Sequence, residues 1–144
     1  MLALCAALVQ PRAGRALDDG RLTVRTGMIA GLSVTAIGLL AAVLPGLAGV
    51  LAGAALIGAG TGLITPLGFA ALAASTPAER LGQTMGAAEL GRELGDAGGP
   101  LLVAGIATLT TLNWGFVALA ALVAVGAAIA LTGRRRPRSV GPGE

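Results

Sequence analysis

Arginine marks the boundaries of four long apolar runs in this chain of 144 residues. The chain has 10 basic residues, all of them arginine, and every one except Arg92 lies outside the runs. The gap at Pro45-Gly46 and the gap at 110–113 carry no charge, so basic and uncharged gaps alternate. This alternation is typical of a chain that crosses a bilayer repeatedly and keeps its cationic connections in the cytoplasm. The arginines outside the runs are Arg12, Arg15, Arg21, Arg25, Arg80, Arg134, Arg135, Arg136 and Arg138.

The composition also indicates a membrane protein. Hydrophobic residues make up 55% of the chain and charged residues 12%, whereas a soluble domain carries about 25% charged residues. The apolar excess must therefore be covered by lipid or by partner protein. The net charge is +3, but the chain has no Tyr, only two Phe and one Trp, and no continuous basic face. We therefore expect no nucleic-acid partner.

The chain has no His and a single cysteine, Cys5. A Ser/His/Asp triad and a Cys/His metal site are excluded, and the commonest general base is missing. We expect neither an enzyme nor a protein with a bound metal or cofactor.

The apolar runs predict an all-α membrane protein with four transmembrane helices in an antiparallel bundle. About 20 residues are needed to cross a bilayer, and the predicted spans are 26–44, 47–74, 81–111 and 114–132. The apolar segment 1–10 is too short to cross, so we expect an N-terminal half-helix whose beginning is absent. We expect the transmembrane domain to comprise residues 1–133 and residues 134–144 to form a disordered, cytoplasmic basic tail.

Small residues recur every fourth position in two of the spans. One row contains Ala54, Gly58, Gly62 and Pro66, and the other contains Gly91, Gly95 and Gly99. Rows of small residues let helix backbones approach closely in lipid. Both rows are therefore predicted to be helix contact faces, and a smooth glycine face would also let helices slide.

Four charged residues lie on one face of the third span, at Glu89, Arg92, Glu93 and Asp96. Residues three and four apart on a helix are neighbours, so Arg92 can pair with Glu89 and Asp96. An ion facing hydrocarbon costs at least about 2.5 kcal/mol, so the stripe must face protein, water or headgroups. Three interpretations stay open: an ion-pair network with a neighbouring helix or loop, a carboxylate that binds a coupling proton, or a contact with a polar substrate.

Two stretches resemble parts of a major facilitator superfamily transporter. Segment 14–21 is similar to the cytoplasmic loop motif of that family, with Gly14 and Asp18 four residues apart and Arg21 after them. The family has Arg where this chain has Asp19, and the motif is one residue short. Segment 56–62, followed by Pro66, resembles the glycine-rich helix that lines the transport cavity.

A third stretch matches the spacing of the antiporter motif of that family. It consists of Gly86, eight residues, Gly95, three residues and Gly99-Pro100. The resemblance covers about 1–133. It implies a partial transporter, preferably the C-terminal half from the end of helix 8 to helix 12, with helix 2 to helix 6 as the alternative.

The resemblance implies roles for individual helices. The helix 47–74 is expected to line the central cavity, with Thr61, Thr65 and Phe69 as candidate lining residues. The helix 81–111 is expected to face the other half, and the motif at 14–21 to hold one closed state. The implied partners are the bilayer, a small-molecule substrate, and the missing half or a second chain.

The expected function is transport of a small solute by alternating access, as proton-coupled efflux of a drug-like or metabolite compound. The expected location is the plasma (inner) membrane, with several crossings and a cytoplasmic C-terminal tail. One alternative is a four-helix dimer like the small multidrug resistance family, but that family carries its essential Glu in the first helix, and 26–44 has no acid. The other alternative is a scaffold or accessory subunit, which predicts a sealed bundle without a polar cavity.

Overall fold

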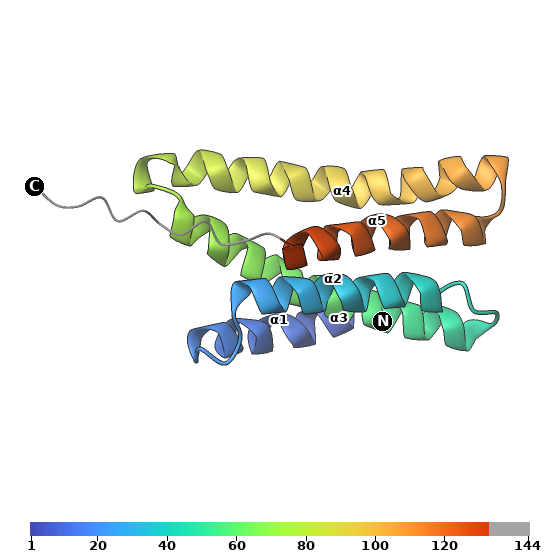
Figure 1. Ribbon diagram of the computed structural model, residues 1–144, viewed down its shortest axis with the longest axis horizontal. Helices are drawn as coiled ribbons and strands as arrows, with labels where there is room; N and C mark the ends of the chain where they lie inside the picture. Colours follow the sequence, from blue (N-terminus) through green and yellow to red (C-terminus); the bar gives the residue numbers. More distant parts are fainter. Residues whose placement is uncertain (133–144) are drawn as a thin grey trace, which may run out of the picture.

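The structure is a computed structural model that describes residues 1–132, and this part of the chain is helical apart from short connections (Figure 1). The prediction of an all-α fold is confirmed. A short 3-10 turn at Ala78–Arg80 precedes α4, and the predicted tail at 134–144 lies outside the described residues. The helices are α1 (Leu2–Asp18), α2 (Val24–Ala41), α3 (Leu47–Ser75), α4 (Leu81–Leu109) and α5 (Leu112–Thr132).

Three of these helices, α2, α3 and α5, are long and apolar enough to cross a membrane. Helix α4 has the same length as α3, 29 residues, but it carries the charged stripe of Glu89, Arg92, Glu93 and Asp96. A crossing by α4 therefore stays a prediction. Helices α3 and α4 continue through Pro66 and Pro100, respectively.

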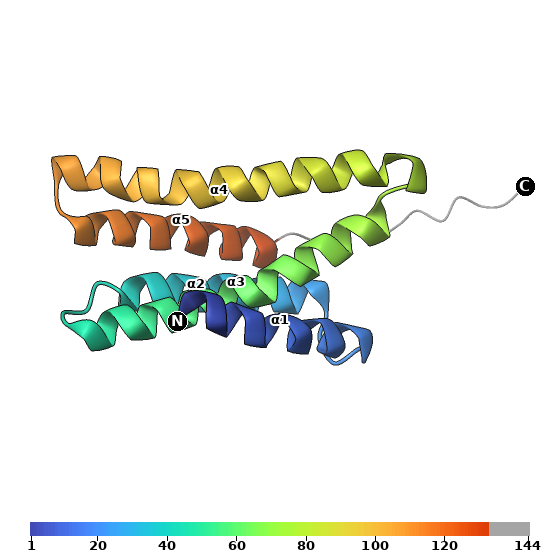
Figure 2. The ribbon, with the colours of Figure 1, turned by 180° about the vertical axis from the view of Figure 1, so that it is seen from behind.

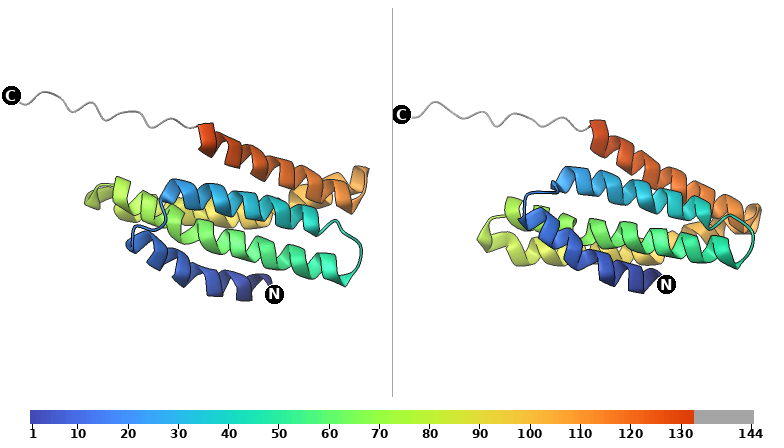
Figure 3. Two further views of the ribbon diagram at one scale, coloured as in Figure 1. Left: turned by 60° about the horizontal axis from the view of Figure 1, so that its bottom comes forward. Right: turned by 90° about the horizontal axis from the view of Figure 1, so that it is seen from below.

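The helices are neighbours in an order that differs from their order in the chain. Extensive contacts join α1 to α3, α3 to α2, α2 to α5 and α5 to α4, whereas α3 and α4 meet at only a few positions. Figure 3 shows α1, α3, α2 and α5 one above another, with α4 behind them. The C-terminal part of α3 leaves α2 and rises toward the start of α4 (Figure 2).

The connections segregate by charge. The α1–α2 and α3–α4 connections and the end of α5 lie at one end of the bundle, and the α2–α3 and α4–α5 connections lie at the other (Figure 1). The first end carries arginines and the second carries no charge. The antiparallel α2–α3 and α4–α5 pairs predicted from the short uncharged gaps are confirmed.

Helix α1 extends beyond the apolar segment 1–10 and contains Pro11. Gly14 and Asp18 lie within it, so the expected loop at 14–21 is wrong for most of its length. The helix ends because Gly20 adopts φ 68°, the left-handed conformation that glycine tolerates just after a helix. Only Arg21 and its neighbours form the connection to α2, and Arg21 pairs with Asp19 at 3.9 Å.

Two glycines of α3 allow the backbone of α1 to approach closely. A Cβ at Gly58 would lie 2.2 Å from the backbone oxygen of Leu2 in α1, and one at Gly62 would lie 2.8 Å from that of Ala6. The predicted contact row is thus confirmed for these two glycines. Packing in lipid depends on such close approach because the hydrophobic effect does not hold helices together there.

Arg25 at the start of α2 forms hydrogen bonds with the end of α5. Its Nε donates a hydrogen bond to the backbone oxygen of Ala130 at 3.2 Å, and its Nη2 donates to that of Leu131. The last carbonyls of a helix lack partners within the helix, and a cation there also suits the helix dipole. This contact adds to the extensive packing of α5 on α2, and α5 in turn packs on α4.

Candidate substrate cavity

A cavity of about 790 Å³ lies between α1, α3 and α4, with one side chain from α5. Small-molecule sites typically measure about 300–1,000 Å³. The cavity exists because α5 holds α4 beside the bundle while α3 and α4 hardly touch. Its lining residues are Leu2, Gln10, Ile57, Thr61, Ile64, Thr65, Phe69, Glu89, Arg92, Gly95, Asp96, Pro100 and Leu119.

The α3 wall contains all three side chains predicted to line a cavity: Thr61, Thr65 and Phe69. They are four residues apart, so they share one helix face. Thr61 Oγ1 donates to the backbone oxygen of Ile57 at 2.9 Å, and Thr65 Oγ1 donates to that of Thr61 at 2.9 Å. Since each hydroxyl proton is used within the helix, the hydroxyl oxygens offer the cavity acceptors.

The α4 wall contains an ion-pair network centred on Arg92. Its Nη2 lies 2.5 Å from Glu89 Oε1, and its Nη1 lies 2.7 Å from Asp96 Oδ2. Its Nε donates to both Glu89 oxygens at 3.1 Å. The predicted pairing is confirmed, but these bonds lie within α4 rather than between α4 and a neighbouring helix or loop.

The stripe divides into residues that line the cavity and one that does not. Glu89, Arg92 and Asp96 line it, whereas Glu93 does not. The side chains remain open, since Asp96 is 69% exposed and Arg92 42% exposed. Among the described residues, the charged groups of the lining are thus two carboxylates and one guanidinium. The described part of the chain contains no group of three or more His, Cys, Asp or Glu side chains that could hold a metal ion.

The residues of the antiporter-like spacing lie along α4 in different surroundings. Gly95 and Pro100 line the cavity. A Cβ at Gly99 would lie 4.0 Å from Leu119, and one at Gly86 would meet nothing within 4 Å. Gly14, Asp18 and Arg21 are absent from the cavity lining.

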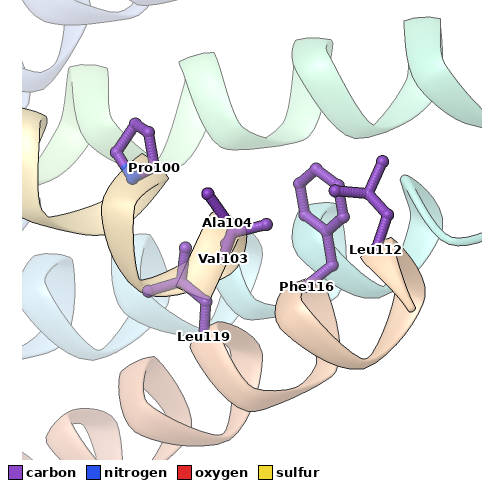
Figure 4. A pocket seen from close by; sticks show the side chains of 6 residues that line it. All are labelled: Pro100, Val103, Ala104, Leu112, Phe116 and Leu119. Carbon is purple, nitrogen blue, oxygen red and sulfur yellow. The ribbon is translucent and has the colours of Figure 1, made fainter. Parts of the chain in front are cut away.

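An apolar pocket of about 300 Å³ adjoins the cavity between α4 and α5. Pro100 and Leu119 line both spaces. In Figure 4, Phe116 and Leu112 of α5 lie next to each other, and Pro100 lies farther along the pocket. Sequence reasoning did not identify this pocket, which is lined by Pro100, Val103, Ala104, Leu112, Phe116 and Leu119.

Sequence reasoning also missed several residues of the larger cavity. Ile57 and Ile64 share the α3 face of Thr61 by their spacing, so the helical period could have identified them. Gln10 is the one polar side chain in the apolar segment 1–10, a position that suggests a polar environment. The position of Leu119 depends on how α5 packs.

One of three comparisons with known proteins gave a match. The model of the Major Facilitator Superfamily matches residues 1–144. The searches of curated proteins and of solved structures gave no match. Since the family match covers the whole sequence and three helices can cross a membrane, this is a multi-pass membrane protein. The chain belongs to the Major Facilitator Superfamily, whose members transport small solutes across membranes.

Proposed function

We propose that the cavity between α3 and α4 is the substrate site of an alternating-access transporter. The observation that supports this proposal is the convergence of hydroxyl and charged side chains from two separate helices on one space of about 790 Å³. The alternative of a scaffold or accessory subunit predicts a sealed bundle without such a cavity. Burying polar and charged side chains within a membrane bundle costs free energy, and groups of this kind mark substrate or ion pathways.

Alternating access requires the walls of the cavity to move relative to each other. In this family the site lies between two six-helix halves that rock against each other. The five helices described here supply part of such a site, and we propose that further helices, from a second half or a second chain, complete it. The small contact between α3 and α4 is compatible with movement of these two walls.

We further propose proton-coupled efflux of a drug-like or metabolite compound from the cytoplasm across the inner membrane, with the arginine-rich end inside. Glu89 and Asp96, whose side chains line the cavity, are the carboxylates that can carry the proton. Vesicles that contain the chain together with the helices that complete the site test the coupling: solute movement should slow when a protonophore dissipates the proton gradient. A rate that does not change would contradict proton coupling and leave the substrate site in place.

Thiol labelling tests the cavity assignment directly. Cys5 is the only cysteine, so Cys5→Ser gives a background without thiols. In that background, the Thr61→Cys thiol is expected to react with a membrane-impermeant maleimide both in right-side-out and in inverted vesicles. The reaction needs the thiolate and therefore water, which an alternating cavity admits from each side in turn.

The matched control is Leu67→Cys on the same helix, because Leu67 is fully buried and does not line the cavity. This thiol should stay unlabelled in both preparations. Labelling of Thr61→Cys from one side only, or from neither side, would overturn the proposed alternating-access site.

A further inference from the structure

We infer that the cavity binds an amphiphilic ammonium ion, which is a protonated amine with an apolar body. This inference rests on the proposed function of the cavity as a substrate site and names the chemical class of the substrate. Three properties of the lining support it: its charge, its excess of hydrogen-bond acceptors and its apolar extension.

The charges of the lining favour a cation. Glu89 and Asp96 carry two negative charges and Arg92 one positive charge, so the formal sum is one negative charge. A bound monocation neutralises this sum, whereas an anion would add to it. Arg92 binds Asp96 through Oδ2, so Oδ1 can accept a hydrogen bond from a ligand. The 69% exposure of the Asp96 side chain makes this oxygen accessible.

The hydrogen-bonding groups favour a ligand that donates. The hydroxyl protons of Thr61 and Thr65 are bonded to α3 carbonyls, so both oxygens face a ligand as acceptors. Arg92 directs its Nε and both Nη atoms at Glu89 and Asp96, so three of its five N–H donors are occupied. An ammonium with N–H groups can donate hydrogen bonds to these oxygens. A phosphate or a carboxylate has acceptor oxygens of its own and cannot.

The remaining lining favours an apolar body on that ammonium. Ile57, Ile64 and Phe69 line the α3 side, and an ammonium near a Phe ring gains a cation–π interaction. Pro100 and Leu119 line both the cavity and the apolar pocket of about 300 Å³, which also contains Phe116 (Figure 4). One molecule can thus place its ammonium at Asp96 and its rings beside Phe116.

Equilibrium dialysis of the purified full chain tests the charge preference with three probes on one ring system. The probes are naphthylethylammonium, the neutral naphthylethanol and the anionic naphthylacetate. The ammonium should bind about fivefold or more tightly than the alcohol, because one ion pair at 4 Å has about this effect even at the dielectric constant of water. The acetate should bind most weakly.

Variants of the charged residues distinguish recognition of the probe charge from general damage to the protein. Glu89→Gln/Asp96→Asn changes the formal charge of the lining from one negative to one positive and should reverse the order, so that the acetate binds best. The single change Asp96→Asn gives a neutral lining and should remove the difference between the ammonium and the alcohol. Glu93→Gln removes the same charge from the same helix outside the cavity and should leave the order unchanged.

Two results would overturn the inference: equal binding of the three probes by the unmodified chain, or an equal response of Asp96→Asn and Glu93→Gln. If the double variant Glu89→Gln/Asp96→Asn does not elute as a monodisperse species, the single variant Asp96→Asn still tests the inference. Failure of the ammonium inference is distinguishable from failure of the proposed function. A site for another substrate class would still label at Thr61→Cys from both sides, whereas a sealed bundle would not.

Discussion

Gly60→Val is expected to separate α2 from α3 and to make the chain lose its fold in detergent at a markedly lower temperature. A Cβ at this position would lie 2.2 Å from Thr35 Oγ1 and 2.6 Å from the backbone oxygen of Gly31. The backbone oxygen cannot move away unless the whole of α2 moves. Overpacking of this kind typically costs about 1–3 kcal/mol. The measurement is the fraction that remains monodisperse in size-exclusion chromatography after heating.

The control for this prediction is Gly68→Val on the same helix, because a Cβ there would meet nothing within 4 Å. Both variants lose the same helix-breaking glycine and gain the same side chain, so their difference reports the contact with α2. Adding Thr35→Ala to Gly60→Ala should restore only part of the stability, since the contact with the Gly31 oxygen remains. Equal stability of Gly60→Val and Gly68→Val would show that the α2–α3 contact is looser than the structure indicates.

The helices could be predicted because the apolar runs and the gaps between them are visible in the local sequence. The predicted spans 47–74 and 81–111 nearly coincide with α3 (Leu47–Ser75) and α4 (Leu81–Leu109). Helix α1 was the exception. Its polar second half has no apolar run to mark it, and the helix continues through Pro11 until Gly20 ends it.

The neighbours of each helix could not be predicted, as the two glycine rows show. Gly58 and Gly62 meet the backbone of α1, whereas a Cβ at Gly91 or Gly95 would meet nothing within 4 Å in the described part of the chain. Spacing identifies the face on which a row lies, but it does not say which element covers that face. The same limit applies to Arg25, whose contact with the end of α5 joins segments more than 100 residues apart.

The candidate site was predictable in parts and not as a whole. The Thr61 face of α3 and the charged stripe of α4 each follow from the helical period. Their convergence on one cavity depends on α5, which packs on both α2 and α4 and holds α4 opposite α3. Sequence periodicity contains no information on that packing, so the exclusion of Glu93 and the inclusion of Gln10 required the structure.

Gly115→Val is expected to destroy the cavity while α1, α2 and α3 stay together. A Cβ at this position would lie 2.7 Å from the backbone oxygen of Val103 and 2.8 Å from its Cγ1, at the closest approach of α5 to α4. Val103 is only 7% exposed and cannot turn away. A strain of about 1–3 kcal/mol changes a population by about 5-fold to about 150-fold, and α4 has little contact with α3 to resist displacement.

The readout is labelling of the Thr61→Cys thiol together with heat stability. Once α4 moves away, acyl chains can cover the apolar flanks of α3, and the thiol loses the water that its reaction needs, so labelling should fall about tenfold. Gly126→Val is the control on the same helix, because a Cβ there would meet nothing within 4 Å. Unchanged labelling in Gly115→Val would mean that α3 alone provides the water-filled path. The charged stripe of α4 would then have to act on something other than the solute beside Thr61.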